Sequence, residues 1–363
     1  MAGIPRRHHF VTKAYLDGFL LPGERHLCCY GRKKIAPFLT APENLANRHD
    51  YYSFKRPDGT IDYSLEAQIG SEIESPGIPV IQKLAAGKAN ISHAERTTLA
   101  KLIALQSVRV PFERNFMDSN HRENLLSYLS DMDEESRRLG VPVNAIEVGV
   151  APRDDPRLIQ KWVTLRRSDI LEMLKELEED PGRTSRETFF GLADHLAEIL
   201  EGMEWTVYYA SGKSRFITSD RPVIVNSADE DGLSRGLKDM RTTVTFPLSG
   251  TALLQLKHRN WLVEAVRKRS CNEPARRRKP ANPVITVLPA DDTFVDILNT
   301  LQANHAHLWV FSGCGQIWLS DWAQAPLKEP KQAAKVLDTE ENISTHGQPA
   351  RRTRKREFVV SHR

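Results

Sequence analysis

The sequence predicts an α+β protein in which a helix-rich N-terminal two thirds packs with a C-terminal antiparallel sheet. Before Met203, apolar residues recur at helical spacing in several amphipathic stretches, and after it they follow a period of two or form short runs. The chain has 363 residues, of which 40% are hydrophobic. That content is enough for a sizeable core without a disulfide framework.

Residues 1–203 are expected to be mainly helical, after two short strands at 25–30 and 50–54. Ser64 is placed to cap a helix that Pro76 and Gly77 break or kink, and Ser92 with Glu95 forms a capping-box pattern for a helix that Pro111 stops. Further helices are expected at 115–139, 156–179 and 185–203.

Residues 204–325 are expected to form mainly antiparallel sheet with one late helix at 292–305. Gly212 and Lys213 suggest a hairpin turn between the first two strands. The expected strands are 205–210, 215–218, 223–226, 243–248, 252–256, 308–311 and 316–319.

We therefore expect one compact body over 1–325 and a disordered basic tail over 326–363. The tail has nine Lys or Arg against five Asp or Glu, which accounts for the whole net charge of +4. A second basic run, Lys257–Lys279, lies inside the body. Both runs suit nucleic-acid phosphates as partners, although solvated charge is the default for such runs.

A cytoplasmic protein without membrane association is expected. No apolar run approaches the roughly 20 residues of a membrane helix, and Lys13 and Asp17 interrupt the segment where a signal peptide would be apolar. The four cysteines have no metal-binding or redox spacing and are predicted to be free thiols.

Four motifs in the chain resemble, in order, those of a bacterial and fungal family known as domain of unknown function 4238. They are RHHFVTKAYLDGF at 7–19, Leu65-Glu66 followed by Glu74, QSVRVP at 106–111, and TSDRPV at 218–223. Val110 departs from the threonine expected before the proline. The resemblance extends over about 7–319 and implies a shared order and fold without supplying an activity.

Gln106 stands near the middle of an apolar helical face, so we expect it to be buried and to need hydrogen-bond partners. Arg109 lies one turn later at the edge of the same face. Two interpretations stay open. The helix presents an amide and a guanidinium into a pocket, or the pair supports carboxylates and carbonyls inside the protein.

Four other residues complete the candidate site: His8, His9, Glu66 and Asp220. His8 and His9 have the chemistry of a general base or a metal ligand. Glu66 and Glu74 are eight residues apart, about 12 Å along a straight helix, so only one of them would bind a given small ion. Asp220 follows a predicted strand, where it would either serve a site or accept backbone N–H bonds in a turn.

Three functions are compatible with these residues. The first is a nuclease-like hydrolase of nucleic acid, with His8, His9, Glu66, Gln106, Arg109 and Asp220 as its site and a divalent metal ion as candidate cofactor. The second is a non-enzymatic nucleic-acid-binding or regulatory module whose polar cluster is structural. The third is a protein-interaction component of a larger system, for which no residue speaks directly. No Walker loop, dinucleotide GxGxxG, GxSxG elbow or HExxH motif is present.

Overall fold

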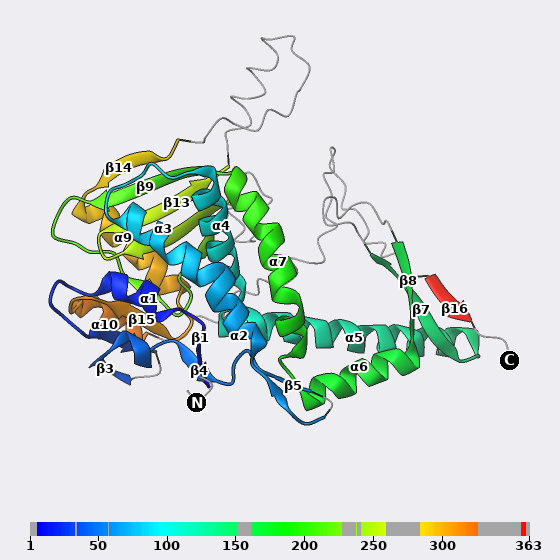
Figure 1. Cartoon of the computed structure of the whole chain (residues 1–363). Helices are drawn as coiled ribbons and strands as arrows, with labels where there is room; N and C mark the ends of the chain where they lie inside the picture. The colour runs from blue at the N-terminus through cyan, green and yellow to red at the C-terminus, as the bar shows by residue number, and fades with distance from the viewer. Residues whose placement is uncertain are drawn as a thin grey trace, which may run out of the picture. The chain divides into compact units, whose positions relative to one another are not determined.

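A computed structural model of the chain describes residues 6–32, 35–56, 58–150, 161–226, 237, 241–258, 284–325 and 357–360 (Figure 1). Its contacts divide the chain into unit 1, Met1–Glu113 with Thr188–Ala334, and unit 2, Arg114–Glu187 with Lys335–Arg363. The boundaries fall inside helices α5 (Pro111–Leu139) and α7 (Arg183–Gly202). This differs from the single body expected over 1–325, because unit 2 has a hydrophobic cluster of its own.

Unit 1 contains a five-stranded sheet. Its order is β11 (Ile224–Asn226), β12 (Thr243–Ser249), β13 (Ala252–Lys257), β9 (Glu204–Ala210) and β14 (Thr286–Ala290). All neighbours are antiparallel except β14 and β9, which are parallel. The sheet follows the predicted strands, apart from β14, which the sequence pattern did not suggest.

The expected hairpin at Gly212 is wrong. The partners of β9 are β13 and β14, and the loop after β9 is instead tied to the helix α9 (Asp292–His305). The Asp292 carboxylate accepts a 2.7 Å hydrogen bond from the Ser214 N–H.

Successive side chains along each strand point to opposite faces of this sheet, and the two faces pack in different hydrophobic clusters. Val207 and Leu254 belong to the largest hydrophobic cluster, which also contains residues of the helices α3 (Ser75–Ala85) and α4 (His93–Val108). Tyr208 and Leu253 point to the other face and pack with residues of α9. The sheet is thus covered by helices on both faces, as alternating apolar strands require.

A second sheet of unit 1 has the order β10 (Thr218–Ser219), β15 (Trp309–Ser312), β2 (Leu27–Gly31) and β3 (Ile35–Thr40). The strand expected at 316–319 is wrong, because Ile317–Gln324 form the helix α10. Leu319, Trp322 and Ala323 pack in one cluster, a helical spacing that becomes visible only when the window extends to Gln324.

The N-terminal segment is held by two short ribbons and several helical turns. The strands are β1 (Arg7–His9) with β4 (Asn47–His49) and β5 (Phe54–Lys55) with β6 (Ile61–Asp62). The expected strand at 50–54 is mostly a turn. The turns are α1 (Lys13–Leu16), η1 (Asp17–Phe19) and η2 (Pro42–Asn44).

Helical structure continues unbroken from Ser64 to Ala85, through α2 (Ser64–Gln68), the π-helical segment η3 (Ile69–Glu74) and α3. Pro76 and Gly77 were expected to break or kink this helix. The break does not occur, and the helix changes from π-helical to α-helical form just before Pro76. Pro76 falls in the first turn of α3, where a missing N–H is tolerated, and the widened π turn precedes it. The Ser64 N–H is capped by the Asp62 side chain at 2.8 Å.

Unit 2 contains the sheet β16 (Glu357–Val360), β7 (Val143–Val150) and β8 (Lys161–Arg166), with the C-terminal part of α5 and the helix α6 (Arg167–Glu179). The helix expected at 156–179 is correct only from Arg167. Residues 161–166 alternate and pair with β7, whereas 151–160 lie outside the described residues.

The tail expected to be disordered is described only at β16, where it pairs with β7, and the rest of 326–363 lies outside the described residues. Two other predictions are confirmed. Ser92 and Glu95 form the capping box of α4, and Cys28, Cys29 and Cys314 are free, Cys271 being outside the described residues. No helix in the described ranges is long and apolar enough to cross a membrane.

Gly77 lets α3 and α4 approach closely, because a Cβ there would stand 2.9 Å from Leu102 Cδ2 and 3.1 Å from Leu102 Cβ. We expect Gly77→Val to lower the free energy of unfolding by about 1 to 3 kcal/mol through overpacking. Gly70→Val is the matched control, because no atom lies within 4 Å of the corresponding position on the same helical run. Urea denaturation of both variants checks this. An equal loss at the two positions would contradict it.

Candidate functional site

His8 is an anchor for the loop that follows β4. Its side chain is fully buried in β1, and its Nδ1 accepts a 3.0 Å hydrogen bond from the backbone N–H of Tyr52. The imidazole stacks on the Tyr52 ring with centroids 5.8 Å apart. An imidazole nitrogen that accepts this bond belongs to the neutral ring, so the contacts of His8 suit a structural role.

His9, the next residue of β1, has a different environment. Its side chain is half-buried, and among the described residues its enclosed Nε2 atom has no hydrogen-bond partner. Burial lowers the pKa of this imidazole below its ordinary value, while a backbone hydrogen bond with Glu43 and the charge of Glu74 act in the opposite direction. His9 is therefore neutral at pH 7 and has an uncommitted nitrogen.

Arg109 and Gln106 lie at the end of α4 and are both buried. The Arg109 guanidinium donates to Glu74 Oε1 at 2.6 Å and, through Nη2 and Nε, to Gln106 Oε1 at 2.6 and 3.1 Å. The Gln106 amide then donates to the Phe10 carbonyl at 2.8 Å. Gln106 is buried as predicted, and these contacts support the internal interpretation of the pair.

Glu66 stands in α2 and is half-buried, with an Oε2 atom that is enclosed and lacks a partner among the described residues. Burial and the negative charge of Glu74 raise its pKa to about 7, although Arg109 lowers it. Glu66 is therefore partly protonated near neutral pH. Both glutamates act on the same guanidinium, whose pKa is lowered by burial but raised overall by Glu74, Tyr52 and Glu66.

Asp220 does not join this group. Its carboxylate is buried after β10 and accepts backbone N–H bonds from His307, Leu308 and Trp309 at 2.9, 2.8 and 3.2 Å. Burial raises its pKa to about 6, against these hydrogen bonds. Its inclusion in the predicted site is thus not supported by position. The sequence pattern Ser-Asp before proline fits the turn interpretation, in which the carboxylate satisfies the backbone.

The structure therefore brings five residues of unit 1 into one network, which we call the acid–base cluster: His9, Glu66, Glu74, Gln106 and Arg109. His8 supports it from the neighbouring position. Tyr51 and Tyr52 were missed by sequence reasoning, yet the Tyr51 hydroxyl donates to the Arg109 carbonyl at 2.9 Å and the Tyr52 hydroxyl to the His9 carbonyl at 3.3 Å. No periodicity marks them, because they stand in a turn.

The described residues contain no group of three or more His, Cys, Asp or Glu side chains arranged to hold a metal ion. The candidate divalent metal ion therefore has no ligand set within those ranges.

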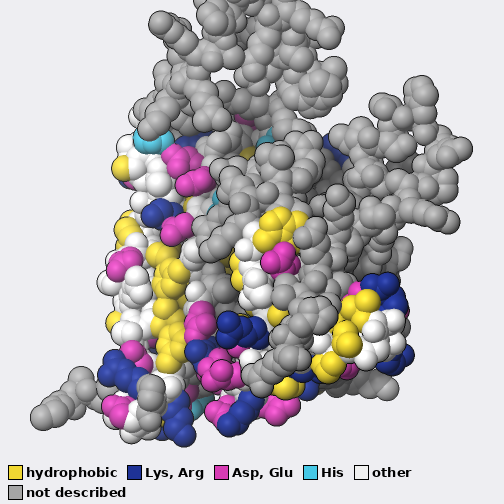
Figure 2. Space-filling model, turned by 90° about the vertical axis from the view of Figure 1, so that its right-hand side faces the viewer, with side chains coloured by type: hydrophobic (Ala, Val, Ile, Leu, Met, Phe, Trp, Pro, Cys, Tyr) yellow, Lys and Arg dark blue, Asp and Glu magenta, His cyan; other side chains and the backbone are white. Residues whose placement is uncertain are grey.

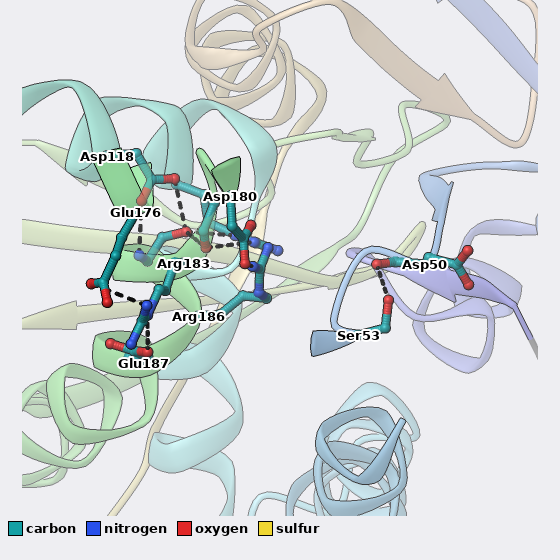
Figure 3. Close-up of polar contacts among 11 residues, drawn as sticks. Asp50, Ser53, Asp118, Glu176, Asp180, Arg183, Arg186 and Glu187 are labelled. Atoms are coloured by element: carbon teal, nitrogen blue, oxygen red, sulfur yellow. Dashed lines mark hydrogen bonds and ion pairs between the residues drawn. The ribbon is translucent and has the colours of Figure 1, made fainter. Parts of the chain in front are cut away.

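Unit 2 has a polar network of its own (Figure 3). Asp118 accepts hydrogen bonds from the backbone N–H and the hydroxyl of Ser185 at 2.8 and 2.9 Å, and Arg114 donates to the same hydroxyl at 3.0 Å. Arg183 forms ion pairs with Glu176 and Glu187 nearby in sequence. These contacts secure the first turn of α7, since a carboxylate at a helix N-terminus satisfies otherwise unpaired N–H groups.

A family model described as "Protein of unknown function (DUF4238)" matches residues 7–314. The chain belongs to this family. The matched range contains every residue of the acid–base cluster. No curated protein and no solved structure matches the chain significantly.

Arg109→Ala should be strongly destabilising, because it leaves the Glu74 carboxylate without its ion-pair partner in a largely enclosed place. We expect a loss of about 3 to 5 kcal/mol in the free energy of unfolding. The exposed Arg25 is the control, and Arg25→Ala should change stability by less than about 0.5 kcal/mol. Urea denaturation measures both. A loss below about 1 kcal/mol for Arg109→Ala would show that the guanidinium is not an internal support.

Because the folded state favours protonated Glu66, the protein should lose stability as the pH rises and this side chain ionises. Its pKa is about 7 in the folded state against 4.5 ordinarily, so the folded state binds more protons between these values and stability falls as pH rises from about 4.5 through 7. Glu66→Gln removes this contribution. The variant should therefore lose less stability than wild type between pH 5 and pH 8 in urea denaturation. Parallel pH curves for the two proteins would contradict the assignment.

Proposed function

We propose that this chain is a hydrolase acting on nucleic acid, in which His9 and Glu66 work as a base and an acid. The observation that supports this most is that His9 Nε2 and Glu66 Oε2 are both enclosed and have no hydrogen-bond partner among the described residues, while the charges of Glu74 and Arg109 act on both side chains. Buried polar atoms without partners are uncommon in folded proteins. Burial raises the pKa of Glu66 to about 7, and a carboxyl group with such a pKa is typical of acid–base sites. Burial lowers the pKa of His9, which favours the neutral imidazole that a general base requires.

The chemistry follows from the protonation states. Neutral His9 accepts a proton at Nε2 from a water molecule, whose oxygen forms the new bond to phosphorus. Protonated Glu66 donates its proton to the leaving ester oxygen as the phosphorus–oxygen bond breaks. Proton transfer by each positioned group typically contributes about 10²- to 10⁴-fold in rate.

The remaining members of the cluster act through these two. Arg109 and Gln106 were expected to orient a phosphate, but their hydrogen bonds are made inside the protein. In this proposal they are positioning residues. Arg109 holds the Glu74 carboxylate in place through their ion pair, and the negative charge of Glu74 contributes to the raised pKa of Glu66.

Nucleic acid is proposed as the substrate because of the two basic runs. Residues 259–279 of the first run and 326–356 of the tail lie outside the described residues. On the described part of the face in Figure 2, Lys and Arg side chains stand beside Asp and Glu, so the charge there is mixed. The phosphate backbone would therefore be held by the two runs.

A non-enzymatic nucleic-acid-binding or regulatory module is the second candidate. It is favoured by the number of internal hydrogen bonds made by Arg109, Gln106 and Asp220, which is typical of a structural network. In that case binding should weaken steeply with salt and survive replacement of His8 and His9 together.

Incubation of the protein with labelled RNA and DNA, with EDTA or with divalent ions, tests the hydrolase. We expect cleavage by wild type, a loss of about 10²-fold or more for His9→Ala and for Glu66→Gln, and little change for the exposed controls His49→Ala and Glu72→Gln. The rate should fall as pH rises through about 7, because Glu66 must be protonated. Intact substrates under all conditions would refute the proposal.

A further inference from the structure

A cavity of about 410 Å³ opens in unit 1, outside the acid–base cluster. Five segments line it: Phe10 after β1, residues 38–48, the start of α5, the turn after β10, and 307–311. Its size lies in the range of roughly 300 to 1,000 Å³ that small-molecule sites occupy. Neither the family nor the proposed chemistry assigns a role to it.

Aromatic rings form much of its wall. Phe38 and Trp309 meet edge to face with centroids 5.7 Å apart, and Phe112 packs against His307 at 5.2 Å. Phe10 and Phe311 also line the cavity. Phe38 remains 40% exposed, although it is a large apolar side chain. Rings of this kind favour a planar ligand that stacks on them.

The charged side chains that line the cavity differ in whether they already have ion-pair or hydrogen-bond partners within the protein. Arg221 is paired with Glu113 and lies over the Phe112 ring at 3.9 Å, while Asp220 is satisfied by three backbone N–H groups. Arg48 is exposed, and within the described ranges it has no ion-pair partner, its guanidinium standing 5.8 Å from the Tyr51 ring. Arg48 is therefore, among the described residues that line the cavity, the cation available for an anionic ligand.

Polar side chains beside the rings can contact the edge of a heterocycle. Asn44 and Thr40 line the cavity together, 3.5 Å apart between the amide nitrogen and the hydroxyl. Asn44 is exposed, so its amide oxygen and remaining N–H remain accessible to a ligand.

We propose that this cavity binds a nucleotide unit, with the base stacked among Phe38, Trp309 and Phe112 and the phosphate at Arg48. The inference rests on the proposed function only in choosing a nucleotide over other planar aromatic anions. The source is either a free mononucleotide or the end of a single strand, and the chemistry recognised is the same.

Isothermal titration with the four ribonucleoside monophosphates, with adenosine, with inorganic phosphate and with a short single-stranded RNA tests the site. We expect monophosphates to bind more tightly than adenosine or phosphate alone, since both subsites are then filled. RNA that binds no better than its monophosphate identifies the free nucleotide as the source, whereas tighter binding of the strand identifies its terminus. Equal affinity for adenosine and its monophosphate would overturn the role of Arg48.

Two variants with matched controls locate the binding. Phe38→Ala should weaken affinity by about fivefold or more through lost stacking, whereas Leu39→Ala, the next residue of β3, with its side chain 69% exposed and outside the cavity, should have no such effect. Arg48→Ala should lower the affinity for the monophosphates and make that affinity depend less on salt concentration. Arg25→Ala should change neither quantity. All four side chains are exposed, so folding should be preserved, which thermal melting by circular dichroism verifies.

The outcome is separable from that of the hydrolase. His9→Ala and Glu66→Gln should bind the monophosphates as wild type does, even where cleavage is lost. Absence of nucleotide binding in a protein that cleaves RNA would overturn this inference and leave the hydrolase intact. Binding that is unchanged by both Phe38→Ala and Arg48→Ala would also overturn it.

Discussion

The fully enclosed guanidinium of Arg109 is the constraint on which the N-terminal half of unit 1 depends. It joins the π-helical segment, through Glu74, to α4, and Gln106 extends the chain of hydrogen bonds to the segment after β1. A buried charge of this kind costs several kcal/mol in lost hydration unless its partners are well placed. The positions of β1, the turn at Tyr51 and the helix carrying Glu66 are therefore fixed together.

The π-helical segment η3 determines where Glu74 lies relative to Arg109. The segment follows α2, which carries Glu66, and it ends at Glu74, two residues before Pro76, so that it connects the two glutamates that act on Arg109. Such segments are rare and are often found at functional sites, because they are maintained only where the surrounding contacts favour them. The π-helical segment thus follows directly on the helix that carries Glu66, whose enclosed Oε2 atom has no hydrogen-bond partner among the described residues.

Phe10 connects the acid–base cluster with the aromatic cavity. Its carbonyl accepts the hydrogen bond from Gln106, while its side chain lines the cavity. The short segment that contains Phe10 therefore contributes to both the acid–base cluster and the cavity. A ligand in the cavity would contact a residue whose backbone is fixed by the cluster, so the two sites share a rigid element.

The sequence by itself determined the fold class, most helices and strands, and the burial of Gln106, because hydrophobic periodicity records which face of an element is covered. Five of the six predicted site residues lie in or beside the cluster, since each carries a polar group at a marked position. The exclusion of Asp220 and the parallel strand β14 were decided only by the tertiary structure. So was the role of Arg109, because whether a guanidinium faces a carboxylate or open space depends on segments distant in the chain, which local pattern does not encode.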